Sequence, residues 1–296
     1  MLFKGTGVAI VTPFCDDRRV DFEALLRVVE HCVAGHVDYF VVLGTTGEAV
    51  TLNASEKRDV VRFVVEAVAK RVQVVMGIGG YDTADTVEAV KQADFTGVSG
   101  LLSVTPYYNR PAQAGLIEHF KAVAAASSVP VILYNVPPRT GVNMTAETTL
   151  RLAHEVDNIV AVKEASGALL QMMQIIKDRP DNFSVISGDD AFSLPLVSIG
   201  GQGVISVAAN AFPQEVSTII RNAMNNDYSA AQTAHYDMLE LFDTLFVDGN
   251  PAGIKAALNI LGLSQNMLRL PLVPVSQKTY DKLYLLIQSK LKKINK

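Results

Sequence analysis

Residues 159–164 read Ile-Val-Ala-Val-Lys-Glu, a short apolar run that ends in two charged side chains. Runs of the same kind recur along the chain, separated by longer amphipathic stretches. They are rich in β-branched residues and mostly lack polar alternation, which is typical of parallel strands buried on both faces. The candidate strands are residues 7–11, 39–43, 72–76, 101–104, 131–134, 159–162, 183–186 and 203–207.

The stretches between these strands have the spacing of amphipathic helices. Five valines share one helical face between residues 60 and 68, and Asn53 with Glu56 predicts a capping box before them. Eight strands, each followed by a helix, predict an α/β fold: a closed (β/α)8 TIM barrel over residues 1–225. Residues 226–296 show helical patterns at 230–246, 251–261 and 277–291, and they predict a C-terminal helical extension.

An open doubly wound sheet is the alternative architecture. That fold typically has a glycine-rich phosphate-binding turn after its first strand. Here the first candidate strand is followed by Thr12-Pro13-Phe14. The barrel is therefore the preferred interpretation.

Composition argues against several classes of function. The 296 residues carry a net charge of −4 without a basic stripe, so we expect no nucleic-acid partner. Two cysteines, and a start without the basic and apolar regions of a signal peptide, favour the cytoplasm. The five histidines show no ligand spacing, so no metal site is expected.

One uncharged segment, residues 191–213, is long enough to cross a bilayer. Pro195, Asn210 and the run Gly200-Gly201-Gln202-Gly203 interrupt it. This pattern predicts a short buried helix, a turn and a buried strand, and no membrane span.

The carboxyl ends of the candidate strands carry most of the residues that could do chemistry, as expected for a barrel enzyme. Lys163 closes an apolar strand, where loss of hydration lowers the pKa of an ammonium and makes a neutral, nucleophilic amine accessible. That is the requirement of Schiff-base catalysis. On its own, a strand-end lysine is more often solvated or paired, so the other motifs decide between the two interpretations.

Four further motifs follow other strands, and each has a structural alternative. The turn Gly44-Thr45-Thr46-Gly47 offers backbone N–H groups to a carboxylate, or it is a plain strand-to-helix turn. Tyr134 could transfer protons, or only fill the barrel top. Arg139 could bind a carboxylate bidentately, or lie on the surface. Asp189-Asp190 could bind a cation, although a helix cap fits it better.

Together these motifs resemble those of the dihydrodipicolinate synthase family, whose members are also called 4-hydroxy-tetrahydrodipicolinate synthases. The family belongs to the pyruvate-dependent lyase and aldolase superfamily. The resemblance covers nearly the whole chain, including Asn250-Pro251 and Lys255 in the extension. Its motifs are Gly44-Thr-Thr-Gly-Glu48, Thr105-Pro-Tyr-Tyr-Asn-Arg-Pro111, Tyr134-Asn-Val-Pro137 with Arg139-Thr-Gly141, Val162-Lys-Glu164 and Ser187-Gly-Asp-Asp190.

The resemblance implies a lyase of lysine and diaminopimelate biosynthesis that needs no cofactor. Lys163 would form an imine with pyruvate, and the derived enamine would add to the aldehyde of L-aspartate 4-semialdehyde. The family pattern assigns proton transfer to Tyr134 with Thr45 and Tyr108. It assigns substrate binding to Thr46, Arg139, Gly188 and Ile205. Because the relay tyrosine reaches across a subunit interface in this family, a homo-oligomer is expected, usually a dimer of dimers.

Two other functions stay in view. N-acetylneuraminate lyase or a 2-keto-3-deoxy sugar acid aldolase would keep Lys163 and Tyr134 but need a pocket for a polyol. Arg139 and the Tyr107-Tyr108 pair argue against these aldolases. A ligand-binding regulator on the same fold would be free to lose the lysine or the tyrosine.

The resemblance also bears on regulation. Family members that are inhibited by L-lysine bind it at the dimer interface, partly through the first tyrosine of the Tyr-Tyr pair. Here that residue is kept as Tyr107, whereas the other aligned positions are Ala49, Ala54, Lys57, Tyr81 and Asp85. Lys57 adds like charge beside a cationic ligand, and Tyr81 occupies ligand space. Weak or absent inhibition is expected.

Overall fold

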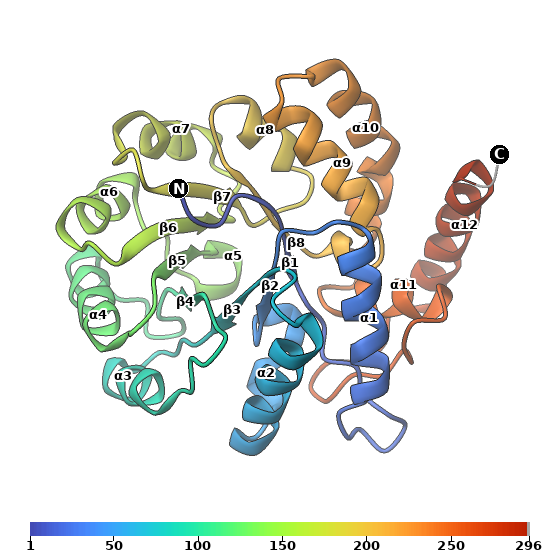
Figure 1. The fold of residues 1–296 in the computed structure, drawn as a ribbon, viewed down its shortest axis with the longest axis horizontal. Helices are drawn as coiled ribbons and strands as arrows, with labels where there is room; N and C mark the ends of the chain where they lie inside the picture. Colours follow the sequence, from blue (N-terminus) through green and yellow to red (C-terminus); the bar gives the residue numbers. More distant parts are fainter. Residues whose placement is uncertain (295–296) are drawn as a thin grey trace.

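The computed structural model describes residues 1–294 of the chain. A closed barrel of parallel strands forms the centre, with the strands in sequence order and helices around them (Figure 1). β1 pairs with β8, so that Gly7 lies opposite Ile205 and the barrel is closed. The predicted barrel is confirmed. Its strands are β1 (Gly5–Ala9), β2 (Tyr39–Val42), β3 (Gln73–Gly77), β4 (Gly100–Val104), β5 (Val131–Asn135), β6 (Ile159–Glu164), β7 (Ser184–Ser187) and β8 (Gly203–Ser206).

Helices follow the strands and cover the outside of the barrel (Figure 1). The predicted capping box is present at α2, where Asn53 and Glu56 each accept the other's backbone N–H. The helices around the barrel are α1 (Phe22–Ala34), α2 (Ala54–Val68), α3 (Thr83–Gln92), α4 (Gln113–Ala126), α5 (Pro137–Thr140), α6 (Ala146–Glu155), α7 (Leu169–Asp178), α8 (Ser193–Ser198) and α9 (Pro213–Met224). Short 3₁₀ helices occur at η1 (Thr45–Gly47), η2 (Ala49–Thr51) and η3 (Ala208–Asn210).

The predicted bounds of the first strand, residues 7–11, were wrong at both ends. β1 spans Gly5–Ala9, the N–H of Ile10 still donates to the carbonyl of Val41 of β2, and from Val11 on a side chain replaces the ladder. The backbone N–H of Val11 donates to Oδ1 of Asn210 at 3.0 Å, and Nδ2 of Asn210 donates to the carbonyl of Ala9 at 2.8 Å. This contact spans nearly the whole barrel sequence, so no local pattern predicts where the strand ends.

The uncharged segment 191–213 folds as predicted, with α8, a turn at the glycines and then β8. No helix within residues 1–294 has both the length and the apolar character needed to span a bilayer.

Three helices make up the C-terminal extension: α10 (Tyr228–Thr244), α11 (Ala252–Ile260) and α12 (Gln277–Ile294). α10 packs against α9, and α12 packs against α10 and α11 (Figure 1). The largest apolar core joins Val8 of β1 and Phe40 of β2 with Leu245, Ile254 and Leu283 of the extension. The extension therefore shares a core with the first strands, and the division at residue 225 stays a prediction.

Candidate active site

Lys163 lies inside β6, one residue before the strand ends, and only 6% of it is exposed. Its register partner on β5 is Tyr134, and Nζ of Lys163 lies 4.3 Å from the centroid of the tyrosine ring. On the side of β7, a Cβ built on Gly188 lies 3.0 Å from Cε of Lys163 and 2.7 Å from Cβ of Ala165. Glycine at position 188 therefore leaves the space that the lysine side chain occupies.

Burial lowers the pKa of Lys163 from 10.5 to about 7, because the charged ammonium loses hydration inside the barrel. The negative charge of Asp190 opposes this shift, and the positive charge of Arg139 adds to it. At pH 7 about half of the amine is then neutral, compared with about 0.03% for an ordinary lysine. The buried amine of Lys163 is therefore far more available as a nucleophile at neutral pH than the amine of an ordinary lysine.

Tyr134 is 7% exposed, and burial raises the pKa of its phenol. Two smaller effects oppose that shift: the charge of Arg139 and a side-chain hydrogen bond with Thr45. The hydroxyl group is therefore protonated at neutral pH and in contact with a second hydroxyl. Of the predicted relay, Tyr134 and Thr45 come together within one chain.

Arg139 lies in α5, and its position follows from the local sequence. Prolines occupy the first turn of this short helix, where a missing N–H costs nothing, and Gly141 ends it with φ of 74°. The N–H of Gly141 donates to the carbonyl of Pro137 at 2.9 Å. Arg139 is exposed, yet its charge acts on both Lys163 and Tyr134. The guanidinium is thus presented at the rim of the site.

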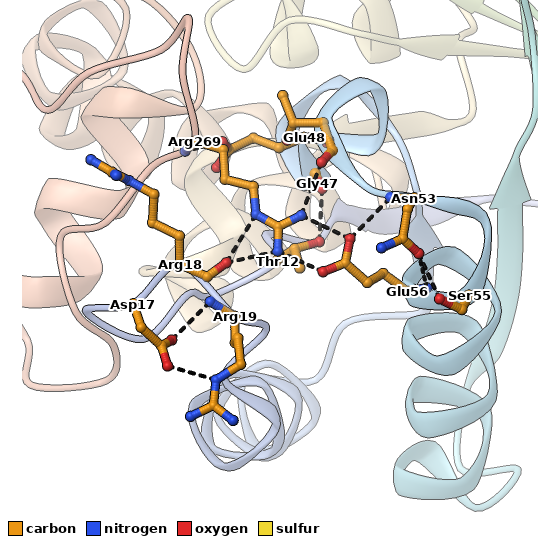
Figure 2. Close-up of polar contacts among 11 residues, drawn as sticks. Thr12, Asp17, Arg18, Arg19, Gly47, Glu48, Asn53, Ser55, Glu56 and Arg269 are labelled. Atoms are coloured by element: carbon orange, nitrogen blue, oxygen red, sulfur yellow. Dashed lines mark hydrogen bonds and ion pairs between the residues drawn. The ribbon is translucent and has the colours of Figure 1, made fainter.

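The turn after β2 brings Thr45 and Thr46 to the same rim in η1. Thr45 is exposed, whereas Thr46 is only 2% exposed and its Oγ1 accepts a hydrogen bond from Nδ2 of Asn250 at 3.0 Å. The hydroxyl of Thr12 donates to the carbonyl of Gly47 at 2.7 Å and fixes the end of the turn (Figure 2). The turn that carries the two threonines is therefore fixed by residues that are distant in sequence, Thr12 and Asn250.

Ile205 is fully buried in β8. Its side chain belongs to the apolar cluster inside the barrel that also contains Tyr134, Ile132 and Ile186. This cluster forms the apolar surroundings that dehydrate Lys163.

Tyr108 does not join the other predicted residues within this chain. It is 89% exposed and has a φ of 71°, while Tyr107 is half-buried and packs edge-on against Tyr81, with ring centroids 5.6 Å apart. The strained backbone and the exposed ring place Tyr108 outward from its own barrel.

Asp190 has a role at the site that the sequence interpretation missed. Asp189, and not Asp190, caps the following turn by accepting from the N–H groups of Ala191 and Phe192. The carboxylate of Asp190 is buried and accepts from the N–H groups of Val207 and Ala208 at 3.1 and 3.0 Å. Burial raises the pKa of Asp190 to about 6, and its charge faces Lys163. The sequence indicates this role only by placing a second acidic residue, Asp190, directly after the capping Asp189.

The chain combines a parallel barrel with a buried lysine of lowered pKa, which lies near the carboxyl end of β6 beside a tyrosine. This combination is typical of barrel enzymes that use a lysine amine as nucleophile. The sequence pattern of the Dihydrodipicolinate synthetase family matches residues 2–290. The chain belongs to this family.

Individual relatives agree with this membership. The chain is 53% identical to 4-hydroxy-tetrahydrodipicolinate synthase of Parabacteroides distasonis, over 95% of this chain and 94% of the relative. The crystal structure of dihydrodipicolinate synthase from Aquifex aeolicus is 42% identical, covers 99% of this chain and 98% of its own, and gives a TM-score of 0.93. The Acinetobacter baumannii enzyme complexed with pyruvate is 38% identical, with coverage of 96% and 98% and a TM-score of 0.93.

These matches confirm the predicted activity, that of a 4-hydroxy-tetrahydrodipicolinate synthase, a lyase of lysine and diaminopimelate biosynthesis. They decide between the synthase and the alternatives, the sugar-acid aldolases and a non-catalytic regulator. Among residues 1–294, no group of three or more His, Cys, Asp and Glu side chains is arranged to hold a metal ion.

Proposed function

We propose that Lys163 attacks the keto carbon of pyruvate as a neutral amine, and that loss of water gives an imine. Removal of a methyl proton turns the imine into an enamine, which adds to the aldehyde carbon of L-aspartate 4-semialdehyde. Ring closure through the amino group of that substrate releases the lysine. The observation that carries this proposal is the burial of Lys163, which brings its pKa to about 7.

Proton transfers in this sequence fall to Tyr134. Its raised pKa keeps the phenol protonated at neutral pH, so it can donate to the alkoxide that forms when the amine attacks. Thr45 is within hydrogen-bond contact of this phenol and passes the proton onward. Tyr108, 89% exposed on its own subunit, completes the relay in the neighbouring subunit of a homodimer. The working unit is therefore an oligomer, with a dimer of dimers as the expected form.

The two substrate carboxylates bind at different places. Thr46 and the N–H groups of the Thr45-Thr46 turn hold the carboxylate of pyruvate, since Thr45 contacts Tyr134, whose ring lies 4.3 Å from Nζ of Lys163. Arg139 binds the carboxylate of the aldehyde substrate, because its guanidinium is exposed, its charge acts on Lys163 and Tyr134, and a guanidinium can hold a carboxylate bidentately. Gly188 and Ile205 line the pocket around the lysine chain.

Borohydride reduction in the presence of pyruvate tests the imine. We expect a reduced pyruvyl adduct on the peptide that contains Lys163, identified by mass spectrometry. Lys255 provides an internal control, because burial also lowers its pKa, to about 8, although it is paired with Glu48. A label on Lys255 or any other lysine, or no label at all, would contradict the mechanism.

A further inference from the structure

Asn250 of the C-terminal extension contacts the proposed pyruvate-binding turn directly. It lies two residues before α11 and is 8% exposed. Its Nδ2 donates to Oγ1 of Thr46 at 3.0 Å, across 204 residues of sequence. No other side chain of the extension donates to the hydroxyl of either threonine of the turn within residues 1–294.

The direction of this hydrogen bond determines what the Thr46 hydroxyl can do. A threonine hydroxyl has one proton to donate and two lone pairs that accept. Because one lone pair is taken by Asn250, the proton of Thr46 is free, and the structure gives it no protein acceptor in residues 1–294. A buried hydroxyl with an unused proton at the rim of the site is suited to a negatively charged ligand.

A buried ion pair holds the extension against the same turn. Glu48 follows Thr46 by two residues, Lys255 follows Asn250 by five, and their side chains form an ion pair with at most 1% exposure. Nζ of Lys255 also donates to the carbonyl of Met267 at 2.9 Å. The backbone N–H of Arg269 donates to Oε2 of Glu48 at 3.1 Å, and Figure 2 shows Arg269 beside Glu48.

Arg269 adds a further connection to the helix that follows the turn. Its guanidinium pairs with Glu56 of α2 at 2.6 Å (Figure 2). It also donates to the carbonyl of Thr51 at 2.9 Å. The amide of Asn250 is therefore carried by a segment that is fixed to the turn at several points.

We propose that Asn250 is a positioning residue that directs the hydroxyl proton of Thr46 toward the carboxylate of pyruvate. The inference rests on the proposed role of Thr46 in binding that carboxylate. In the orientation observed, Oδ1 of Asn250 is buried and has no hydrogen-bond partner among residues 1–294. In the opposite orientation Oδ1 would take the Thr46 proton, and no donor would be left for the substrate. The extension is thus part of the pyruvate site.

Steady-state kinetics with varied pyruvate test this role. Asn250→Ala removes the donor and lets the Thr46 hydroxyl rotate, so we expect the pyruvate KM to rise about 3- to 10-fold. Asn250→Asp has the same size but only accepts, so it captures the Thr46 proton and adds a negative charge. For it we expect a rise of about 30-fold or more. The KM for the aldehyde substrate should change less than twofold, about the scatter of such measurements.

A double-mutant cycle separates positioning from a purely structural effect. Thr46→Val removes the hydroxyl through which Asn250 acts, so Asn250→Ala should not raise the pyruvate KM further in that background. Asn259→Ala is the matched control, because it removes the same amide from α11, where it contacts Ser264 and Tyr280. This control should leave the pyruvate KM unchanged.

Three results would overturn the proposal: additive effects in the cycle, an unchanged KM in Asn250→Asp, or the same KM change in Asn259→Ala. Asn250→Asp preserves the side-chain volume and carries the test even where Asn250→Ala does not fold. Failure of the proposed function is recognised separately, since the wild-type chain would then give no borohydride-trapped pyruvate on Lys163.

Discussion

Replacing Lys163 with methionine should stabilise the protein while abolishing its activity. Methionine has a similar length and no charge to desolvate. The folded-state pKa of Lys163, about 7, lies below the ordinary value of 10.5, so the folded state binds the lysine proton less tightly than the unfolded chain does. The buried ammonium therefore costs stability at neutral pH.

The pH dependence fixes both the sign and the size of the effect. Below pH 7 the amine is protonated in both states and the folded protein carries the full cost, about 5 kcal/mol for this pKa difference. Between pH 7 and 10.5 only the unfolded chain binds the proton, so the free energy of unfolding of the wild type rises with pH. The advantage of Lys163→Met should be about 5 kcal/mol at pH 6 and about 2 kcal/mol at pH 9.

Urea unfolding at pH 6 and pH 9, at one fixed protein concentration, measures this difference. Lys177→Met is the control, because the side chain of Lys177 is 79% exposed and its removal should change stability little at either pH. An advantage of Lys163→Met that is the same at both pH values would show that the amine is not desolvated. A loss of stability at pH 6 would refute the reasoning altogether.

Three further predictions concern the second substrate, regulation and the buried ion pair. Arg139→Ala should lower kcat/KM for the aldehyde substrate roughly 30- to 1000-fold, about 2 to 4 kcal/mol, while borohydride trapping of pyruvate persists; lost trapping with normal use of the aldehyde would contradict the assignment. Titration of activity with L-lysine should show weak or no inhibition, and strong inhibition at micromolar to low millimolar lysine would show that the substitutions at the family's lysine site do not disable it. Lys255→Met should lower the free energy of unfolding, measured with denaturant, by about 3 to 5 kcal/mol, because Glu48 is then buried without its cation. Glu48→Gln combined with Lys255→Met should recover most of this loss, and a loss below about 1 kcal/mol in the single variant would contradict the prediction.

The barrel could be predicted from the sequence because its strands are buried on both faces, which leaves a run of apolar residues for each. The burial of Lys163 near the end of β6 was predictable for the same reason, because a single charge closes an apolar run. The strand extends one residue beyond it, to Glu164. The end of β1 could not be predicted, because the side chain of Asn210 replaces its ladder bonds.

The contacts of the C-terminal extension could not be predicted from the sequence either. Lys255 lies in the run Ala252-Gly-Ile-Lys-Ala-Ala-Leu258, where a single charge in a helix is usually solvent-exposed. Its partner Glu48 sits next to the turn motif and is 1% exposed. Because the two residues are far apart in sequence, only the assembled core shows that each neutralises the other. In this part of the sequence, the sign that Lys255 is buried is its isolated position among small apolar residues.

The pairing of Glu48 with Lys255 also sets an order of events during synthesis on the ribosome. Chains grow from the N-terminus at about 5 to 20 residues per second, so Lys255 is added about 10 to 40 s after Glu48. Until then the carboxylate of Glu48 lacks the cation beside which it is buried in the folded chain. The buried pair that joins the threonine turn to the extension can therefore form only after α11 (Ala252–Ile260) has been synthesised.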